Sequence, residues 1–278
     1  MLIRLLVWNG GNEVIRGTDP HNSSIRDLIN IQLRISEKAL KSIEQSKAHR
    51  LKPTIVLGLD AAYSRKYGGV AVASLVQAES CNLIEYGVAV GEPRLEYIPG
   101  LLAFREAALF YAATEGLSYK NYDVIVVDGH GISHPRYAGI ATHMGLALAK
   151  PSIGVAKKKL YGEFNMINER SSCIEYPCVI GELRDPKRDI VLAYVVIPKS
   201  RDKNPIYISP GAFISIENAL NIILSMLRAS SSKLPCPTHY SDKLSKRIAR
   251  ELDKGIIRPE SLKHLGLGTL DKYIHRLS

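Results

Sequence analysis

The feature that most constrains the fold is a run of four β-branched residues, 124–127, that ends at the carboxylate of Asp128. Such a run is typical of a strand that is buried on both faces of a sheet. Gly129 and Gly131 follow at once, and glycine permits a tight turn and the close approach of another backbone. Ligands of open α/β sheets bind at the carboxyl ends of the strands. A carboxylate there favours a bound cation, because an unpaired charge is costly to bury.

The segments around this strand predict an α/β protein with one mixed sheet flanked by helices. Residues 54–60 read as an apolar strand that also ends on a carboxylate, Asp60. Two strands at 70–76 and 83–90 follow after short turns, which indicates an antiparallel meander. Further strands are expected at 152–156, 178–183, 190–197 and 206–209, and helices at 23–49, 101–113, 137–149 and 215–227.

Composition and charge indicate which kind of molecule the protein binds and in which cellular compartment it works. The net charge of +10 over 278 residues favours a polyanionic partner, most simply nucleic acid. The four cysteines form no CxxC pair, which predicts reduced thiols in a cytoplasmic protein. No apolar stretch approaches the length of a membrane span, and a monomer is the default expectation. We expect an N-terminal arm at 1–22, a catalytic domain at 23–234 and a basic, partly helical C-terminal extension at 235–278.

Three acids lie at the ends of expected strands or inside an expected helix. Asp60 and Asp128 each end a strand, and Glu106 lies inside the helix at 101–113. If the two strands are parallel, their ends are neighbours and the helix can place Glu106 over them. Three oxygen ligands suit Mg²⁺, with Mn²⁺ as a substitute, and such a site can hold a phosphate and activate a water molecule. This order of elements and acids is typical of the ribonuclease H-like nucleases.

Six stretches of the chain, residues 57–60, 97–106, 128–136, 139–143, 153–158 and 204–211, together resemble the endonuclease V family. The resemblance implies a ribonuclease H-like fold and a metal-dependent DNA repair endonuclease that recognises inosine. Such an enzyme nicks the strand one nucleotide 3′ of the lesion and leaves a 3′-hydroxyl and a 5′-phosphate. DNA containing deoxyinosine and RNA containing inosine both stay open as substrates, because contacts to a 2′-hydroxyl are not legible in a sequence.

The resemblance also implies roles for individual residues. Asp60, Glu106 and Asp128 match the metal ligands of the family, and Lys157 matches its active-site lysine, which would offset charge on the phosphate. A stiff Tyr-Ile-Pro loop matches the wedge that replaces stacking beside an extruded base. The residues expected to contact nucleic acid are Tyr97, Ile98 and Pro99 in the wedge, Leu102, Gly129 and Ile140 around the base, and His130, Gly131, His134 and Lys158 beside them.

Two positions depart from the family pattern. Glu96 stands where the wedge usually begins with proline, and Ala212 stands where the family has a histidine that we expect to lie near the metals. A methyl group in place of an imidazole predicts reduced activity, and the alternative function is a weakened or non-catalytic protein that binds inosine-containing strands. Whether Ala212 is natural or engineered is open. Glu217 could approach the metals, but a solvated helix acid is the simpler interpretation.

Two other interpretations, a zinc site and an actin-like ATPase, have weaker support in the sequence. His130, His134 and His143 lack the cysteines or local carboxylates that would complete a tetrahedral zinc site. The first two are interpreted as hydrogen-bonding or phosphate-contacting groups, and His143 as a structural helix residue. An actin-like ATPase shares a first strand ending in Gly-x-Asp, but the second glycine-rich phosphate loop is missing from this sequence.

Overall fold

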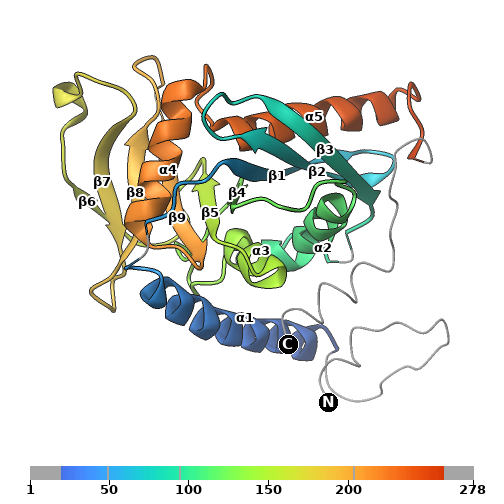
Figure 1. The fold of residues 1–278 in the computed structure, drawn as a ribbon. Coiled ribbons are helices and arrows are strands. Elements are labelled where there is room, and N and C mark those ends of the chain that lie inside the picture. The colour runs from blue at the N-terminus through green and yellow to red at the C-terminus, as the bar shows by residue number, and fades with distance from the viewer. Residues whose placement is uncertain (1–19, 49, 94, 203, 260–278) are drawn as a thin grey trace.

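Nine strands form a single mixed sheet in the computed structural model, which describes residues 20–48, 50–93, 95–202 and 204–259 (Figure 1). The strand order is β3-β2-β1-β4-β5-β9-β8-β7-β6. The strands are β1 (Ile55–Ser64), β2 (Gly68–Gln77), β3 (Leu83–Gly91), β4 (Val124–Val127), β5 (Ser152–Ala156), β6 (Glu163–Met166), β7 (Cys178–Arg184), β8 (Val191–Ile197) and β9 (Ile206–Ala212). The helices are α1 (Pro20–Gln45), α2 (Leu102–Glu115), α3 (Ile140–Leu148), α4 (Ile216–Ala229), α5 (Cys236–Asp253) and the short 3₁₀ helix η2 (Arg170–Ser172).

The predicted mixed α/β sheet is confirmed, including its central register. β1, β2 and β3 form the antiparallel meander, and β1, β4 and β5 are parallel. Leu59 pairs with Val127 across β1 and β4. Asp60 and Asp128 are the next residues on each chain, so the register alone brings the two carboxylates to the same point of the sheet.

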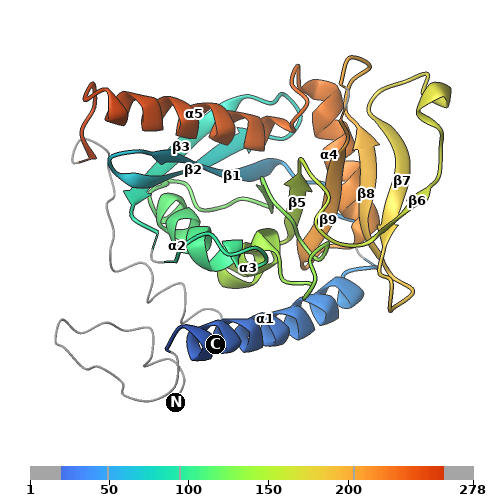
Figure 2. The same ribbon diagram turned by 180° about the vertical axis from the view of Figure 1, so that it is seen from behind.

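Helices cover both faces of the sheet, and the alternation of side chains along β1 divides the core between them. Leu57 and Leu59 pack with α2 and α3 on one face, whereas Val56 packs with α4 on the other. Figures 1 and 2 show α1, α2 and α3 on one side of the sheet and α4 and α5 on the opposite side. The burial of both faces explains why the central strands read as continuous apolar runs.

The N-terminal part of α5 lies directly on β1 and β2 because Gly58 leaves room for the backbone of the helix. A Cβ atom at Gly58 would lie 2.3 Å from the carbonyl oxygen of Pro237, so only glycine fits beneath the helix there. Ser241 donates its hydroxyl to the Gly58 carbonyl at 2.9 Å, and Ser74 donates to the Pro237 carbonyl at 2.8 Å. These buried hydrogen bonds fix the position of the helix against the sheet.

The expectation of reduced cysteines is wrong. Cys81 in the β2–β3 turn is joined to Cys236 at the start of α5, and Cys173 is joined to Cys178. The Cα atoms of each pair are 5.7 and 6.0 Å apart, within the usual range of a disulfide. Because the first pair is separated by 155 residues, its pairing left no local trace in the sequence.

Several elements also differ from the sequence-based expectation. Among the helices, α1 spans Pro20–Gln45 rather than 23–49, and α3 begins at Ile140 rather than near residue 137. β1 continues to Ser64, into the segment expected to turn; β6 was not expected at all; and α5 begins at Cys236 rather than near residue 244. No helix in the described part of the chain is long and apolar enough to cross a membrane. Most of the expected N-terminal arm, and residues 260–278 of the expected extension, lie outside the described residues.

Candidate active site

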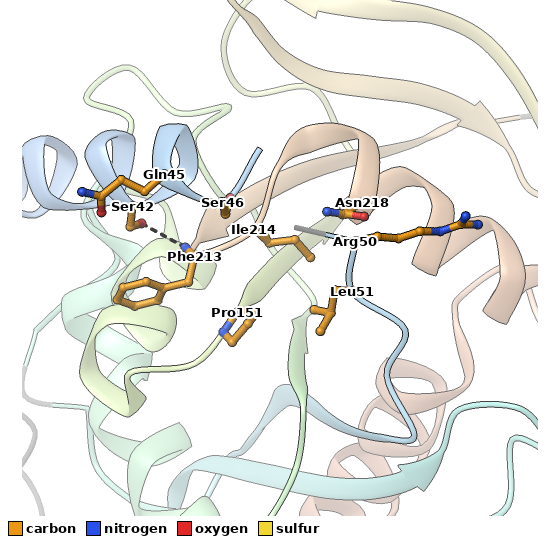
Figure 3. A pocket seen from close by; sticks show the side chains of 9 residues that line it. All are labelled: Ser42, Gln45, Ser46, Arg50, Leu51, Pro151, Phe213, Ile214 and Asn218. Carbon is orange, nitrogen blue, oxygen red and sulfur yellow. Dashed lines mark hydrogen bonds between the residues drawn. The ribbon is translucent and has the colours of Figure 1, made fainter. Parts of the chain in front are cut away.

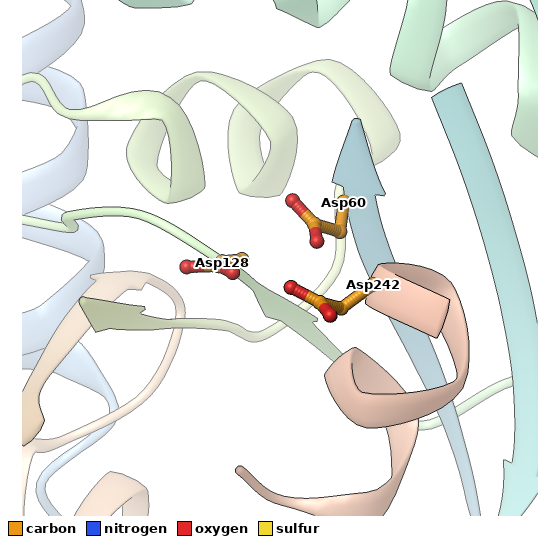
Figure 4. A group of neighbouring side chains, drawn as sticks. All are labelled: Asp60, Asp128 and Asp242. Atoms are coloured by element: carbon orange, nitrogen blue, oxygen red, sulfur yellow. The ribbon is translucent and has the colours of Figure 1, made fainter. Parts of the chain in front are cut away.

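Three carboxylates from three different elements converge at one end of the central strands. Asp60 belongs to β1, Asp128 follows β4, and Asp242 lies in α5. One oxygen atom from each lies within 4.8 Å of the others, and Figure 4 shows the three side chains gathered in one place. The backbone amide of Asp128 donates to the Leu59 carbonyl at 3.0 Å, which continues the sheet pairing to the site.

Lys157 supplies positive charge at the edge of this cluster. Its ammonium group forms a short ion pair with Asp128 and a second one with Asp242 at 3.0 Å, and 38% of its side chain is exposed. Lys157 directly follows β5, the strand next to β4, so the sheet order places it here. Lys246, one helical turn after Asp242, also contacts the Asp242 carboxylate, at 2.7 Å.

The local electrostatics favour a cation. Burial, followed by repulsion from Asp128, raises the pKa of Asp60 from 3.8 to about 8. Burial also raises the pKa of Asp128, although Lys157 opposes this effect. Asp242 is half-buried; this partial burial raises its pKa, but the hydrogen bonds from Lys246 and Lys157 outweigh it and hold the pKa below the ordinary value. Because burial and mutual repulsion disfavour the ionised forms of Asp60 and Asp128, a divalent cation with oxygen ligands would stabilise these carboxylates and suits the site.

Glu106 lies beside the cluster but is not among the carboxylates that meet within 4.8 Å. It projects from α2 and accepts a hydrogen bond from the Tyr63 hydroxyl at 2.7 Å. Burial raises the pKa of Glu106, the hydrogen bond from Tyr63 opposes this, and Asp128 is close enough to raise the pKa further. The third place in the cluster is taken by Asp242, and a ligand role for Glu106 stays a prediction.

The expected wedge lies in the loop before α2. Tyr97 is 65% exposed, Pro99 is exposed and Ile98 is half-buried. The end of this loop is held by the carbonyl of Gly100, which accepts hydrogen bonds from Gln32 at 3.0 Å and from Arg136 at 2.8 Å. The aromatic ring is therefore presented to solvent from an anchored backbone.

The glycine-rich loop after Asp128 packs tightly against its surroundings. A Cβ atom at Gly129 would lie 2.5 Å from the Ile140 side chain, and one at Gly131 would lie 2.1 Å from the Pro210 carbonyl oxygen. The structure thus brings Gly129 and Ile140 into contact, and their place around the base stays a prediction. Leu102, at the start of α2, is half-buried, and Lys158 is exposed next to Lys157.

The three histidines occupy buried or half-buried positions, and none belongs to the carboxylate cluster of the described residues. The His134 ring contacts the Gly100 carbonyl at 3.1 Å, and burial lowers its pKa to about 4, so the neutral ring helps to anchor the wedge loop. Burial also lowers the pKa of His130 to about 4, and its Nδ1 has no hydrogen-bond partner among the residues that the structure describes. His143 is fully buried in α3 and packs edge-on against Phe104, as a structural residue would.

The expectation that position 212 lies near the metals is wrong. β9 runs antiparallel to β5, so that Tyr207 pairs with Ala156 at the end that leads into Lys157, and Ala212 pairs with Ser152 at the other end. Four residues of strand separate the two ends by about 13 Å. Ala212 is completely buried, and its amide donates to the Ser152 hydroxyl at 2.9 Å.

The neighbours of Ala212 form a separate feature. Phe213 lines a hollow of about 330 Å³ between α1 and α4, together with Ser42, Arg50 and Leu51 among others (Figure 3). The Ser42 hydroxyl accepts a hydrogen bond from the Phe213 amide at 2.9 Å. Glu217 is exposed in the first turn of α4, which agrees with its interpretation as a solvated acid.

Asp242 is the residue that the sequence did not reveal. Its segment reads as a solvated helix in which Asp242 and Lys246 form an ordinary i,i+4 pair. One signal was available: Ser241, Ser245, Ile248 and Leu252 recur at helical spacing and are all buried, which marks a helix face that packs on the domain. A packed helix, rather than an appended tail, can bring an acid to a site.

Comparison with known proteins agrees with this arrangement. The family model of endonuclease V matches residues 37–243, which include all three converging aspartates. The endonuclease V of Aeropyrum pernix is 40% identical over 220 residues, covering 79% of this chain and 78% of that protein.

Solved structures show the same fold. Endonuclease V from Streptomyces avermitilis superposes with a TM-score of 0.68 at 26% identity, covering 81% of this chain and 93% of that chain. Ciona intestinalis endonuclease V, solved in complex with DNA containing an inosine followed by a ribo-adenosine, has a TM-score of 0.68 at 22% identity, covering 83% and 99%. The chain therefore belongs to the endonuclease V family and is a nuclease, a hydrolase by reaction class.

Proposed function

We propose that this enzyme is a metal-dependent endonuclease that cuts DNA one nucleotide 3′ of deoxyinosine and acts in DNA repair. The observation that carries the proposal is the convergence of Asp60, Asp128 and Asp242 beside Lys157 in a member of the endonuclease V family. The inosine-containing DNA bound by the Ciona intestinalis protein supports the choice of substrate. The earlier alternative of a weakened enzyme loses its basis, because Ala212 is buried at the far end of β5.

The cation proposed for the site is Mg²⁺, with Mn²⁺ as a substitute. Asp60, Asp128 and Asp242 would hold it, because their oxygens already meet and a cation would relieve the repulsion between the ionised carboxylates. When bound, such an ion polarises the scissile phosphate and makes a water molecule more acidic. In the hydrolysis, the water oxygen bonds to phosphorus and the bond to the 3′ oxygen breaks. The 3′ oxygen takes up a proton, which leaves a 3′-hydroxyl and a 5′-phosphate.

The chain's own residues would bind and orient the strand. The exposed ammonium groups of Lys157 and Lys158 can donate to phosphate oxygens. Tyr97 would stack in place of the extruded inosine, which the glycine-rich loop at Gly129 would receive near Ile140. The net charge of +10 adds a salt-dependent attraction to the strand. We further propose that the enzyme works as a monomer in the cytoplasm.

The proposal is tested with two end-labelled DNA strands that differ only by inosine or adenine at one position, incubated with Mg²⁺ and, separately, with EDTA. We expect one product, cut one nucleotide 3′ of inosine, only in Mg²⁺. Its ends are identified by ligation, which requires the 3′-hydroxyl and 5′-phosphate. Equal cutting of the adenine strand, or cutting in EDTA, would refute the proposal. A matched strand with ribose at and around the inosine determines whether RNA is preferred.

A further inference from the structure

A short chain of hydrogen bonds joins Glu106 to the loop that carries Tyr97. The Tyr63 hydroxyl donates to Oε1 of Glu106 at 2.7 Å and accepts a hydrogen bond from Nε of Arg105 at 2.9 Å. Nη1 of the same arginine donates to the Leu95 carbonyl at 2.8 Å. The Arg105 guanidinium also lies over the Tyr63 ring, 4.8 Å from its centroid. One arginine therefore holds both the tyrosine and the loop.

The chemistry of these groups fixes the direction of each bond. A guanidinium can only donate, so the phenol oxygen of Tyr63 must accept from Arg105. The single phenol hydrogen is then committed to Glu106, and the bond engages Oε1 while Oε2 is not part of it. Tyr63 is 42% exposed and makes no other side-chain hydrogen bond among the contacts described, so the core does not require this hydroxyl.

We propose that Tyr63 and Arg105 are positioning residues: Tyr63 orients the Glu106 carboxylate toward the cation site, and Arg105 couples that carboxylate to the wedge loop. The role of the loop as a wedge rests on the proposed function. The effect of Tyr63 on the orientation of Glu106 does not depend on the identity of the substrate. Groups that hydrogen-bond to metal-binding side chains typically change metal affinity or activity 10–100-fold when they are removed.

The placement of the two residues favours coupling over simple local packing. The loop is anchored at its other end by the Gly100 carbonyl, which accepts from Gln32 and Arg136 and thus ties it to α1 and the glycine-rich loop. The hydrogen bond from Arg105 to the Leu95 carbonyl holds the beginning of the loop. If a bound nucleic-acid strand pushes on Tyr97 and moves the loop, the hydrogen bond to Leu95 would pass this movement to Arg105. Arg105 would then pass it to Glu106 through Tyr63.

The test measures cation binding and strand recognition separately. Mn²⁺ affinity of the full-length protein without nucleic acid is measured by calorimetry. Dissociation constants for the inosine and adenine strands are measured in Ca²⁺, and cleavage is followed as Mg²⁺ is titrated. We expect Tyr63→Phe to weaken Mn²⁺ binding about tenfold and to raise the Mg²⁺ requirement similarly, with unchanged preference for inosine. Arg105→Met should weaken Mn²⁺ binding and also reduce the preference, whereas Arg105→Lys should retain part of both.

Tyr119→Phe is the matched control, because Tyr119 is similarly exposed, at 41%, and lies in the segment after α2. Unchanged Mn²⁺ affinity in a folded Tyr63→Phe, or the same loss in Tyr119→Phe, would overturn the positioning role. Unchanged inosine preference in Arg105→Met would overturn the coupling. Failure of the proposed function is distinguishable: the wild type would then not cut the inosine strand, whatever the effect of Tyr63→Phe on Mn²⁺ affinity.

Discussion

Replacing Asp60 by asparagine should stabilise the metal-free protein. Asp60 is only 9% exposed, and its pKa is raised from 3.8 to about 8, first by burial and then by repulsion from Asp128. At pH values between these two pKa values, the folded protein keeps a proton on Asp60, while the unfolded chain releases it. The free energy of unfolding of the wild type therefore falls as pH rises from about 4 to about 8, and levels off above that range. Asparagine cannot ionise, so the free energy of unfolding of the variant does not show this decrease.

The magnitude follows from the same pKa values. At pH 7 the folded state retains a proton that the unfolded state loses over about three pH units, and each unit corresponds to about 1.4 kcal/mol. The expected gain for Asp60→Asn at pH 7 is thus up to about 4 kcal/mol. For a domain of this size, that corresponds to a rise in Tm on the order of 10 °C.

Thermal unfolding of both proteins, followed by circular dichroism in EDTA at several values between pH 4 and pH 9, is the assay. We expect the two Tm values to converge toward pH 4 and to separate as the pH rises to 8. Adding Mg²⁺ at pH 8 should stabilise the wild type far more than the variant, because a cation that binds only the folded state adds to its stability. A constant difference across this range, or a less stable variant at pH 8, would refute the electrostatic explanation.

Three further predictions concern single sites elsewhere. Tyr97→Ala should reduce the difference in binding free energy between inosine and adenine strands by about 1–3 kcal/mol, as measured by fluorescence anisotropy; an unchanged difference would leave Tyr97 without a stacking role. Cys81→Ser should lower stability by up to about 5 kcal/mol in the chain-entropy view, because the disulfide to Cys236 closes a loop of 155 residues; equal Tm values under oxidising conditions would contradict this. Ala212→His should overpack the core, cost about 1–3 kcal/mol or more, and leave single-turnover cleavage no faster; a faster enzyme would contradict the position assigned to Ala212.

The sequence predicted the centre of the site because local pattern and sheet physics agree there. Asp60 and Asp128 each end an apolar run of the sequence, and the parallel pairing of β1 with β4, which the sequence analysis took as a condition, brings them together. The role of Lys157 was implied only by the family resemblance; in the structure Lys157 directly follows β5, the strand next to β4. The length and helical pattern of α2 also followed from the sequence to within two residues at each end.

The rest depended on contacts between segments that are far apart in the chain. Asp242 reaches the cluster only because Gly58 lets α5 lie on β1, a fit that no local pattern encodes. The pairing of Cys81 with Cys236 has the same origin. Ala212 was misplaced because it follows a conspicuous motif closely in sequence, although the antiparallel direction of β9 carries it away from the acids.

The most direct test of the central claim is the single-turnover cleavage rate of an inosine-containing strand by the wild type and by Asp242→Asn, titrated with Mg²⁺. Asparagine keeps the volume of the side chain but removes one of the three converging charges. We expect the wild type to cut with saturable dependence on Mg²⁺. The variant should bind the strand in Ca²⁺ with similar affinity yet cut it at least 100-fold more slowly, in line with the loss of a group that holds the cation. Cleavage by Asp242→Asn at the wild-type rate and the same Mg²⁺ requirement would contradict the assignment of these carboxylates as the metal site.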